Sequence, residues 1–289
     1  MQSLAVTLII AAAFLHAGWN LLAKASKNTA ALMWWATVFG TVGYGLWLAS
    51  GPGIILNSGS WFPFSVSALC EAGYFVTLVQ GYSKGDLSLV YPISRGSAPI
   101  LAALLGVIVL AEYLPWAGYF GVGLMVVGIY VTSRPVGPSS NGGGNPTRPQ
   151  VSAVVWALAS GIFISIYSVS DKLAVAATPP LVYNWWVFAG NAVLWAPFVW
   201  RRNRFKLNIH ELQDNWRNIF ATSVMSVGAY AAALTALSMT SASYVVAGRG
   251  LSVVIGAMFG YLLLRERFGR VRIFGAILMV VGLGIIAFS

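Results

Sequence analysis

The sequence is poor in charge, and poorest in acidic residues. Of its 289 residues, 8% are charged and only seven are Asp or Glu. An ordinary soluble domain has about 25% charged residues, so this chain cannot build the usual polar surface. Long apolar runs instead recur about every 30 residues, which is typical of repeated membrane-spanning helices. The composition therefore excludes an ordinary soluble domain and indicates lipid as the solvent.

The sequence also lacks the residues of disulfide and metal sites. Cys70 is the single cysteine, which excludes a disulfide within the chain. No Cys/His cluster has the spacing of metal ligands, so we expect neither a metal nor another cofactor. The NGGGN tract at 141–145 lacks the Lys-Ser/Thr of a phosphate-binding loop and is interpreted as part of a flexible connector.

Ten runs of about 20 apolar residues predict ten spanning helices. The first run has no basic stretch before it and is long enough to span, which favours a helix over a cleaved signal peptide. Residues 133–150 are rich in Pro, Gly, Ser and Asn and predict a flexible linker. The predicted helices cover 2–23, 29–49, 62–82, 87–110, 114–132, 151–171, 180–200, 216–238, 241–264 and 268–288.

Basic residues lie almost entirely in alternate loops. With their flanks, the loops after the first, third, fifth, seventh and ninth predicted helices hold Lys24, Lys27, Lys84, Arg134, Arg148, Arg201, Arg202, Arg204, Lys206, Arg217, Arg265, Arg267, Arg270 and Arg272. The opposite loops hold only Lys172. The positive-inside rule places the basic loops in the cytoplasm of a bacterial inner membrane and both termini in the periplasm. This orientation signal, and not nucleic-acid binding, accounts for the net charge of +10.

The two halves of the chain resemble each other. At a spacing of 154 residues, GYFGVGLMVVG at 118–128 aligns with RIFGAILMVVG at 272–282. The same spacing aligns Arg95 with Arg249 and Glu112 with Glu266; slightly different spacings align Trp34-Trp35 with Trp185-Trp186, Tyr74 with Tyr230, and Lys24 with Lys172. The sequence therefore predicts a first repeat at 1–132, a cytoplasmic linker at 133–150 and a second repeat at 151–289.

Each repeat holds five helices, an odd number, so the second must enter the membrane inverted relative to the first. The loop charges agree, because 111–115 has no basic residue while the corresponding loop reads RERFGRVR. We predict an all-α, polytopic membrane protein with ten transmembrane helices in two inverted five-helix repeats. Such an arrangement favours a central site that is reached alternately from each face.

These features resemble the EamA family of the drug/metabolite transporter superfamily. The resemblance covers nearly the whole chain and rests on Trp19-Asn20 and, in each half, on a glutamate followed by a Gly-rich last helix (Glu112, Gly121, Gly128; Glu266, Gly275, Gly282). It implies a ten-helix carrier of amino acids and related metabolites, without ATP hydrolysis.

Polar residues inside predicted spans are candidate pathway residues, because polar groups at that depth face the bundle interior. His16, Trp19 and Asn20 share one face of the first helix. They either contact the substrate or form hydrogen bonds between helices. In the sixth helix, Tyr167, Ser168 and Asp171 occupy the matching region.

Glu71 is the most deeply placed carboxylate, with Tyr74 on the same helix face, and Arg95 is its expected partner beside Tyr91 in the fourth helix. The pair either clamps two helices or rearranges during transport, with protons as a candidate coupling ion. Arg249 corresponds to Arg95, and Asp171 is its expected partner. We expect a Glu71–Arg95 clamp on the cytoplasmic side and an Asp171–Arg249 clamp on the periplasmic side.

Aromatic residues make up 13% of the chain, and some should line a cavity. Trp34, Trp35, Trp185 and Trp186 begin two helices, where a membrane-interface belt is the favoured interpretation. The deeper aromatic residues are candidates for stacking on a substrate or for binding a cation. They are Trp19, Tyr74, Tyr91, Tyr167, Tyr230 and Tyr244.

The sequence favours a secondary transporter, an exporter of amino acids or related amphipathic solutes that works by alternating access. The alternative is a membrane-embedded lipid-handling protein or enzyme, but no HExxH, paired aspartates or Ser/His/Asp set supports catalysis. Gly256 and Gly260 form a GxxxG pattern that indicates close helix packing. Because two fused halves already supply the internal pairing, we expect a monomer or weak homodimer.

Overall fold

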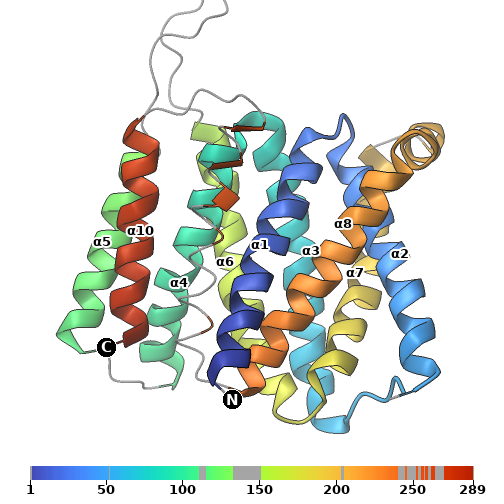
Figure 1. Cartoon of the computed structure of the whole chain (residues 1–289), viewed down its shortest axis with the longest axis horizontal. Helices are drawn as coiled ribbons and strands as arrows, with labels where there is room; N and C mark the ends of the chain where they lie inside the picture. The colour runs from blue at the N-terminus through green and yellow to red at the C-terminus, as the bar shows by residue number, and fades with distance from the viewer. Residues whose placement is uncertain are drawn as a thin grey trace, which may run out of the picture.

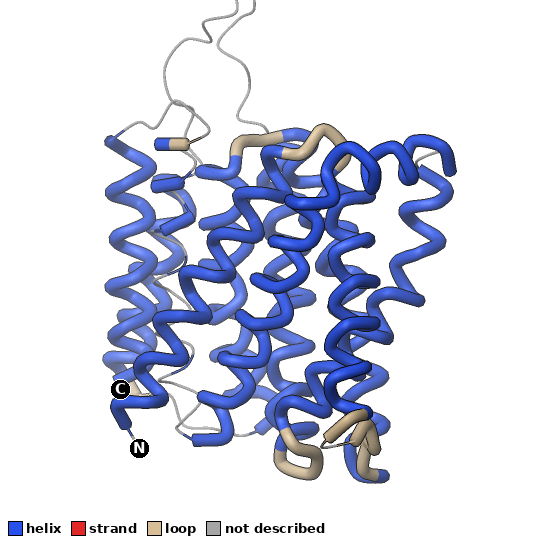
Figure 2. Tube along the Cα trace, turned by 45° about the vertical axis from the view of Figure 1, so that its right-hand side comes forward, coloured by secondary structure: helices blue, strands red, loops and turns tan. Residues whose placement is uncertain are grey.

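The structure, a computed structural model, describes residues 2–51, 53–110, 115–132, 151–202, 205–239 and 270–288, with isolated positions between 245 and 263. These residues form nine α-helices and a short 3-10 helix, and no strand occurs among them. The helices stand side by side in one bundle (Figures 1 and 2). They are α1 (Gln2–Ala25), α2 (Thr29–Ala49), η1 (Ser58–Ser60), α3 (Trp61–Lys84), α4 (Leu87–Leu110), α5 (Trp116–Thr132), α6 (Val151–Val175), α7 (Pro180–Arg202), α8 (Phe205–Met239) and α10 (Arg270–Phe288).

The apolar runs of the sequence account for these helices, most of which end within a few residues of the predicted bounds. Among the described residues, four spans are long and apolar enough to cross a membrane by length and composition alone: Leu4–Ala25, Ser58–Lys84, Val151–Val175 and Ile209–Met239. The predicted helix at 241–264 lies mostly outside the described residues, so the count of ten remains a prediction.

Helix α8 differs from its prediction at 216–238, because it already begins at Phe205. Its backbone is non-helical at Asn215 (φ −120°, ψ 21°), where two helical segments meet at a kink. The segment before the kink is polar, so no apolar run marks it as a helix. It turns away from the direction of the rest of α8 (Figure 1).

Both ends of the chain lie at the same end of the bundle, which we call the terminal face (Figure 1). The opposite end is called the basic face, because α1, α3 and α7 end there with Lys24, Lys84, Arg201 and Arg202. Helix α1 runs from the terminal face to the basic face, and α6 runs the opposite way.

Several contacts between helices of the two halves occur as matched pairs. Helix α3 packs on α6, and α1 packs on α8; likewise α2 packs on α8, and α3 packs on α7. If α1, α2 and α3 correspond to α6, α7 and α8, the contact of α3 on α6 is the counterpart of that of α1 on α8. The contact of α2 on α8 is likewise the counterpart of that of α3 on α7. The contacts of α2 on α7 and of α5 on α10 are their own counterparts, whereas the counterpart of α4 on α6 would involve the predicted helix at 241–264, which lies mostly outside the described residues. This packing is what a two-fold relation between the halves requires.

The crossing of α5 and α10 repeats this symmetry at atomic scale. A Cβ atom added to Gly128 would lie 2.6 Å from the carbonyl oxygen of Gly275, and one added to Gly282 would lie 2.5 Å from that of Gly121. The same Cβ atoms would press on Met279 and Met125, respectively. Only glycine allows the two backbones to approach this closely.

A second symmetric contact joins α2 to α7. Trp34 Nε1 donates a hydrogen bond of 2.9 Å to the carbonyl oxygen of Ala192, and Trp185 Nε1 donates one of 2.9 Å to that of Thr41. The interface-belt interpretation therefore needs correction for these two tryptophans. Trp34 is buried, and both rings tie one half of the bundle to the other.

Candidate functional site

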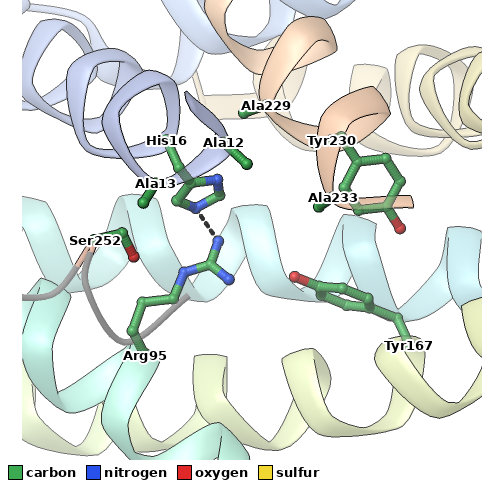
Figure 3. Close-up of a pocket in the computed structure, with 9 residues that line it drawn as sticks. All are labelled: Ala12, Ala13, His16, Arg95, Tyr167, Ala229, Tyr230, Ala233 and Ser252. Atoms are coloured by element: carbon green, nitrogen blue, oxygen red, sulfur yellow. Dashed lines mark hydrogen bonds between the residues drawn. The ribbon is translucent and has the colours of Figure 1, made fainter. Parts of the chain in front are cut away.

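A small cavity lies inside the bundle among α1, α4, α6 and α8 (Figure 3). Its volume is about 30 Å³. Four alanines form one part of its wall, and five residues with polar side chains form the rest. The lining residues are Ala12, Ala13, His16, Arg95, Tyr167, Ala229, Tyr230, Ala233 and Ser252.

Arg95 is the charged residue of this wall and is 8% exposed. Its Nη2 contacts His16 Nε2 and donates a hydrogen bond of 3.3 Å to the Tyr74 hydroxyl, while the guanidinium carbon lies 5.5 Å from the centre of the Tyr74 ring. Its Nε has no hydrogen-bond partner among the described residues. Buried donors are nearly always satisfied, so an orphaned guanidinium nitrogen beside a cavity indicates an acceptor supplied by a ligand or water.

The polar face of α1 divides between the cavity and the helix packing. His16 lines the cavity, and Trp19 Nε1 donates to its Nδ1 at 3.3 Å. Asn20 is fully buried and accepts a hydrogen bond of 2.6 Å from the Tyr82 hydroxyl. The structure thus places His16 at the cavity and Asn20 in the contact between α1 and α3.

The carboxylate of Glu71 does not contact Arg95. Glu71 is 6% exposed and accepts a hydrogen bond of 2.9 Å from Asn191 of α7. The guanidinium group of Arg95 contacts His16 and Tyr74. Its attraction to Glu71 is a longer-range electrostatic interaction without a hydrogen bond. The expected Glu71–Arg95 clamp is therefore wrong for this conformation.

Asp171 is the second buried carboxylate, at 2% exposure. Its Oδ1 accepts hydrogen bonds from Ser67 at 2.6 Å and from Tyr183 at 2.8 Å, and its Oδ2 accepts one from Tyr230. Asp171 and Glu71 lie close enough to repel each other electrostatically. The proposed partner Arg249 lies outside the described residues, so the Asp171–Arg249 clamp stays a prediction.

The other predicted residues fall in several environments. Tyr74 and Tyr91 are buried around Arg95 and His16; the Tyr91 ring stacks on His16 with centroids 6.2 Å apart. Tyr167 lines the cavity, whereas Ser168 is half-buried on α6. Tyr244 lies outside the described residues.

Several residues of this region are not among those predicted from the sequence. Asn191 is an amide inside an apolar run, and the rule that selects Asn20 would also select it. No feature of the sequence marks Ser67 and Tyr183 as site residues, because hydroxyl side chains are common in spanning helices. Their importance comes from their contact with Asp171, which only the structure shows. The alanines of the wall are not marked either, since a cavity depends on how helices pack.

A wider space opens at the basic face. This vestibule has a volume of about 620 Å³ between the α1–α2 connection, the end of α3 and the start of α8. A layer of buried aromatic residues lies between it and the central cavity: Trp19 faces Phe75, which stacks on Trp195 with centroids 5.0 Å apart. The cavity and the vestibule are therefore separate spaces in this conformation. The vestibule is lined by Lys24, Ser26, Lys27, Asn28, Thr29, Ala30, Val79, Tyr82, Ser83, His210, Glu211 and Asp214.

Within the described residues, no group of three or more His, Cys, Asp or Glu side chains could hold a metal ion. The site is a set of buried charges, amides and aromatic rings around and beside a small cavity. These features define a class: a polytopic helical membrane protein with a polar site in the middle of its bundle.

Comparison with known proteins identifies the family. The model of the EamA-like transporter family matches residues 3–134 and 151–288, so the chain belongs to this family. The match covers both predicted repeats and indicates a membrane transporter of the drug/metabolite superfamily, which is a class of transporters and not of enzymes.

A solved structure titled "Crystal structure of protein" is similar to this chain with a TM-score of 0.66 and 15% sequence identity. The similarity covers 98% of this chain and 96% of that one, which shows a shared fold. No curated protein matches the sequence.

Proposed function

We propose that this protein is a secondary transporter that exports amino acids or related small amphipathic solutes by alternating access. The observation that carries the proposal is Arg95, whose buried guanidinium group borders the central cavity with an unsatisfied Nε. A buried cation with a free donor is suited to the carboxylate of a solute.

The surroundings of Arg95 support a solute with charges of both signs. Asp171 and Glu71 lie on the neighbouring helices, and the aromatic rings of Tyr167 and Tyr230 line the cavity between them. An amino group would be attracted to the carboxylates and to the faces of the rings. The aromatic walls would also favour an apolar side chain.

Alternating access supplies a path to the site. A cavity of about 30 Å³ holds one or two waters, so a solute must enter in another conformation. We propose that the ten helices form two inverted repeats, 1–132 and 151–289, joined by a cytoplasmic linker at 133–150. Opening would alternate between the two faces by motion of one repeat against the other.

We further propose that the basic face is cytoplasmic in a bacterial inner membrane, as the positive-inside rule requires, and that both termini are periplasmic. Protons are the proposed coupling ion, with Glu71 as the exchanging carboxylate. Glu71 lies next to the cavity-lining helices and accepts a hydrogen bond from a neutral amide, that of Asn191.

Counterflow in proteoliposomes tests the proposal. Purified protein is reconstituted and assayed for exchange of amino acids, nucleosides, sugars and cationic drugs. We expect exchange of an amphipathic amino acid, and we expect Arg95→Ala to weaken its apparent affinity at least tenfold, because truncating one partner of a buried charge pair costs about 2 kcal/mol or more.

Arg95→Lys and Lys84→Ala are the controls. The lysine variant keeps the charge and should retain part of the affinity, and Lys84 is exposed at the basic face and should tolerate the change. Absence of exchange for every solute in the panel would contradict the proposed function. An unchanged affinity in Arg95→Ala would remove Arg95 from the site.

A further inference from the structure

Asp171 joins four helices through three hydroxyl groups. It lies on α6 and accepts from Ser67 of α3, Tyr183 of α7 and Tyr230 of α8. We call these four residues the Asp171 hub. Hydrogen bonds to a charged acceptor are about twice as strong as neutral ones, and a shared buried acceptor holds its donors in one arrangement.

The hub continues toward the terminal face into a second set of contacts. The Ser60 hydroxyl donates to the carbonyl oxygen of Ala174 at 3.0 Å and lies 2.8 Å from the Thr178 hydroxyl. The backbone N–H of Asn57 donates to Thr178 Oγ1 at 3.2 Å. Ala174 is three residues after Asp171 on α6. These contacts, the terminal latch, tie the start of α3 to the end of α6 beside the hub.

Tyr230 belongs to both the hub and the cavity. Its ring lines the cavity (Figure 3). Its hydroxyl donates a hydrogen bond to Asp171. The other two donors do not line the cavity: Ser67 and Tyr183 are both fully buried. A change in the cavity can therefore reach the hub through the Tyr230 side chain.

The size of the cavity makes such a change unavoidable on binding. About 30 Å³ accommodates water but no metabolite, so an occupant must displace part of the wall. Among the lining residues of α8, Ala229 and Ala233 have no rotatable side chain, so Tyr230 is the side chain of that helix that can move aside.

We propose that Tyr230 couples occupancy of the central cavity to closure of the terminal face. An occupant displaces the Tyr230 ring, the hydroxyl leaves Asp171, and the weakened hub releases the terminal latch. The proposal rests on the proposed transport function for its biological meaning, but the coupling itself is a property of the protein without substrate. Tyr230 is then a positioning residue: it transmits occupancy of the cavity to the Asp171 hub, whereas Tyr183 contacts the hub without lining the cavity.

A larger side chain at Ala233 can stand in for an occupant. In full-length protein in lipid nanodiscs, hydrogen–deuterium exchange is followed in peptides that contain 57–60 and 174–178. We expect Ala233→Phe and Tyr230→Phe each to speed exchange there about tenfold, as loss of a hydrogen bond to a charged group predicts. Val224→Phe, on an exposed position of the same helix, should leave exchange unchanged.

The double variants decide the inference. Ala233→Phe should add nothing in the Tyr230→Phe background, because the bond it breaks is already gone. It should still speed exchange in the Tyr183→Phe background, because Tyr230 there remains bound to Asp171. Ala233→Leu repeats the series with a smaller side chain if the phenylalanine variant does not elute as a single folded species.

Full additivity of Ala233→Phe with Tyr230→Phe would overturn the coupling. So would unchanged exchange in Tyr230→Phe, or no effect of either Ala233 variant in any background. Counterflow measured on the same preparations distinguishes the two proposals. If the protein moves no solute but its single and double variants show the expected exchange rates, the coupling stands and the transport function is contradicted.

Discussion

At the scale of single residues, the two buried carboxylates have different surroundings. Asp171 receives hydrogen bonds from three hydroxyl groups, whereas Glu71 interacts with the Asn191 amide and with Tyr230, a hydroxyl that it shares with Asp171. A carboxylate that accepts from hydroxyls of three other helices holds those helices together and is suited to a structural role. Glu71 has fewer such partners and one of them is a neutral amide, so we propose it, and not Asp171, as the group that exchanges a proton during transport.

Glu71→Gln should therefore separate proton coupling from solute exchange. The amide keeps an acceptor for Asn191 but cannot release a proton. We expect an imposed pH gradient to stop driving net solute movement, with the initial rate falling to that without a gradient, while counterflow at equal pH persists. Proteoliposomes with and without the gradient give the measurement, and gradient-driven movement in the variant at the wild-type rate would contradict the role of Glu71.

At the scale of helices, the bundle is held by contacts that occur twice. Trp34 and Trp185 make equivalent hydrogen bonds between α2 and α7, and Gly128 and Gly282 make equivalent approaches between α5 and α10. At each of these glycines, a backbone carbonyl oxygen of the facing helix lies within 2.6 Å of the position that a Cβ atom would occupy. The two halves therefore contribute equally to these contacts.

Gly128→Leu and Gly282→Leu should consequently destabilise the protein by similar amounts. Overpacking of a tight contact costs about 2 kcal/mol, and backbone carbonyls at 2.6 and 2.5 Å from the added Cβ cannot move aside easily. Thermal unfolding in detergent measures the effect. Gly123→Leu is the control, since a Cβ there meets nothing within 4 Å. A glycine variant as stable as this control would contradict the close crossing.

At the scale of the whole molecule, the helix directions define two chemically different faces. Both termini lie at the terminal face, and the lysines and arginines that end α1, α3 and α7 lie at the other. If the positive-inside rule applies, the terminal face is outside the cell.

Single cysteines test this orientation in a Cys70→Ala background. Ser50 follows α2 at the terminal face, Ser238 lies near the end of α8 at the same face, and Ser83 lies near the end of α3 at the basic face; all three are exposed. We expect a membrane-impermeant maleimide added to intact spheroplasts to label Ser50→Cys and Ser238→Cys, and to label Ser83→Cys only after permeabilisation. The reverse pattern would invert the assigned orientation.

The sequence by itself determined most of the described helices and identified the polar residues expected to face the interior, and it predicts a correspondence between the halves. About 20 apolar residues in a row form a spanning helix whatever their neighbours are, and a polar group among them avoids lipid. The spacing of 154 residues also pairs Gly121 and Gly128 with Gly275 and Gly282, the glycines that meet where α5 crosses α10. The polar start of α8 could not be predicted in this way, because it has no apolar run.

Only the tertiary structure decided which interior groups meet. Arg95 contacts His16 and Tyr74 in place of Glu71, Glu71 pairs with Asn191, and Asp171 collects hydroxyls from three helices. Such contacts depend on the tilt and rotation of each helix, which are set by packing against its neighbours and not by its own apolar run. The spans follow from local composition, whereas the site is a consequence of how the spans are packed together.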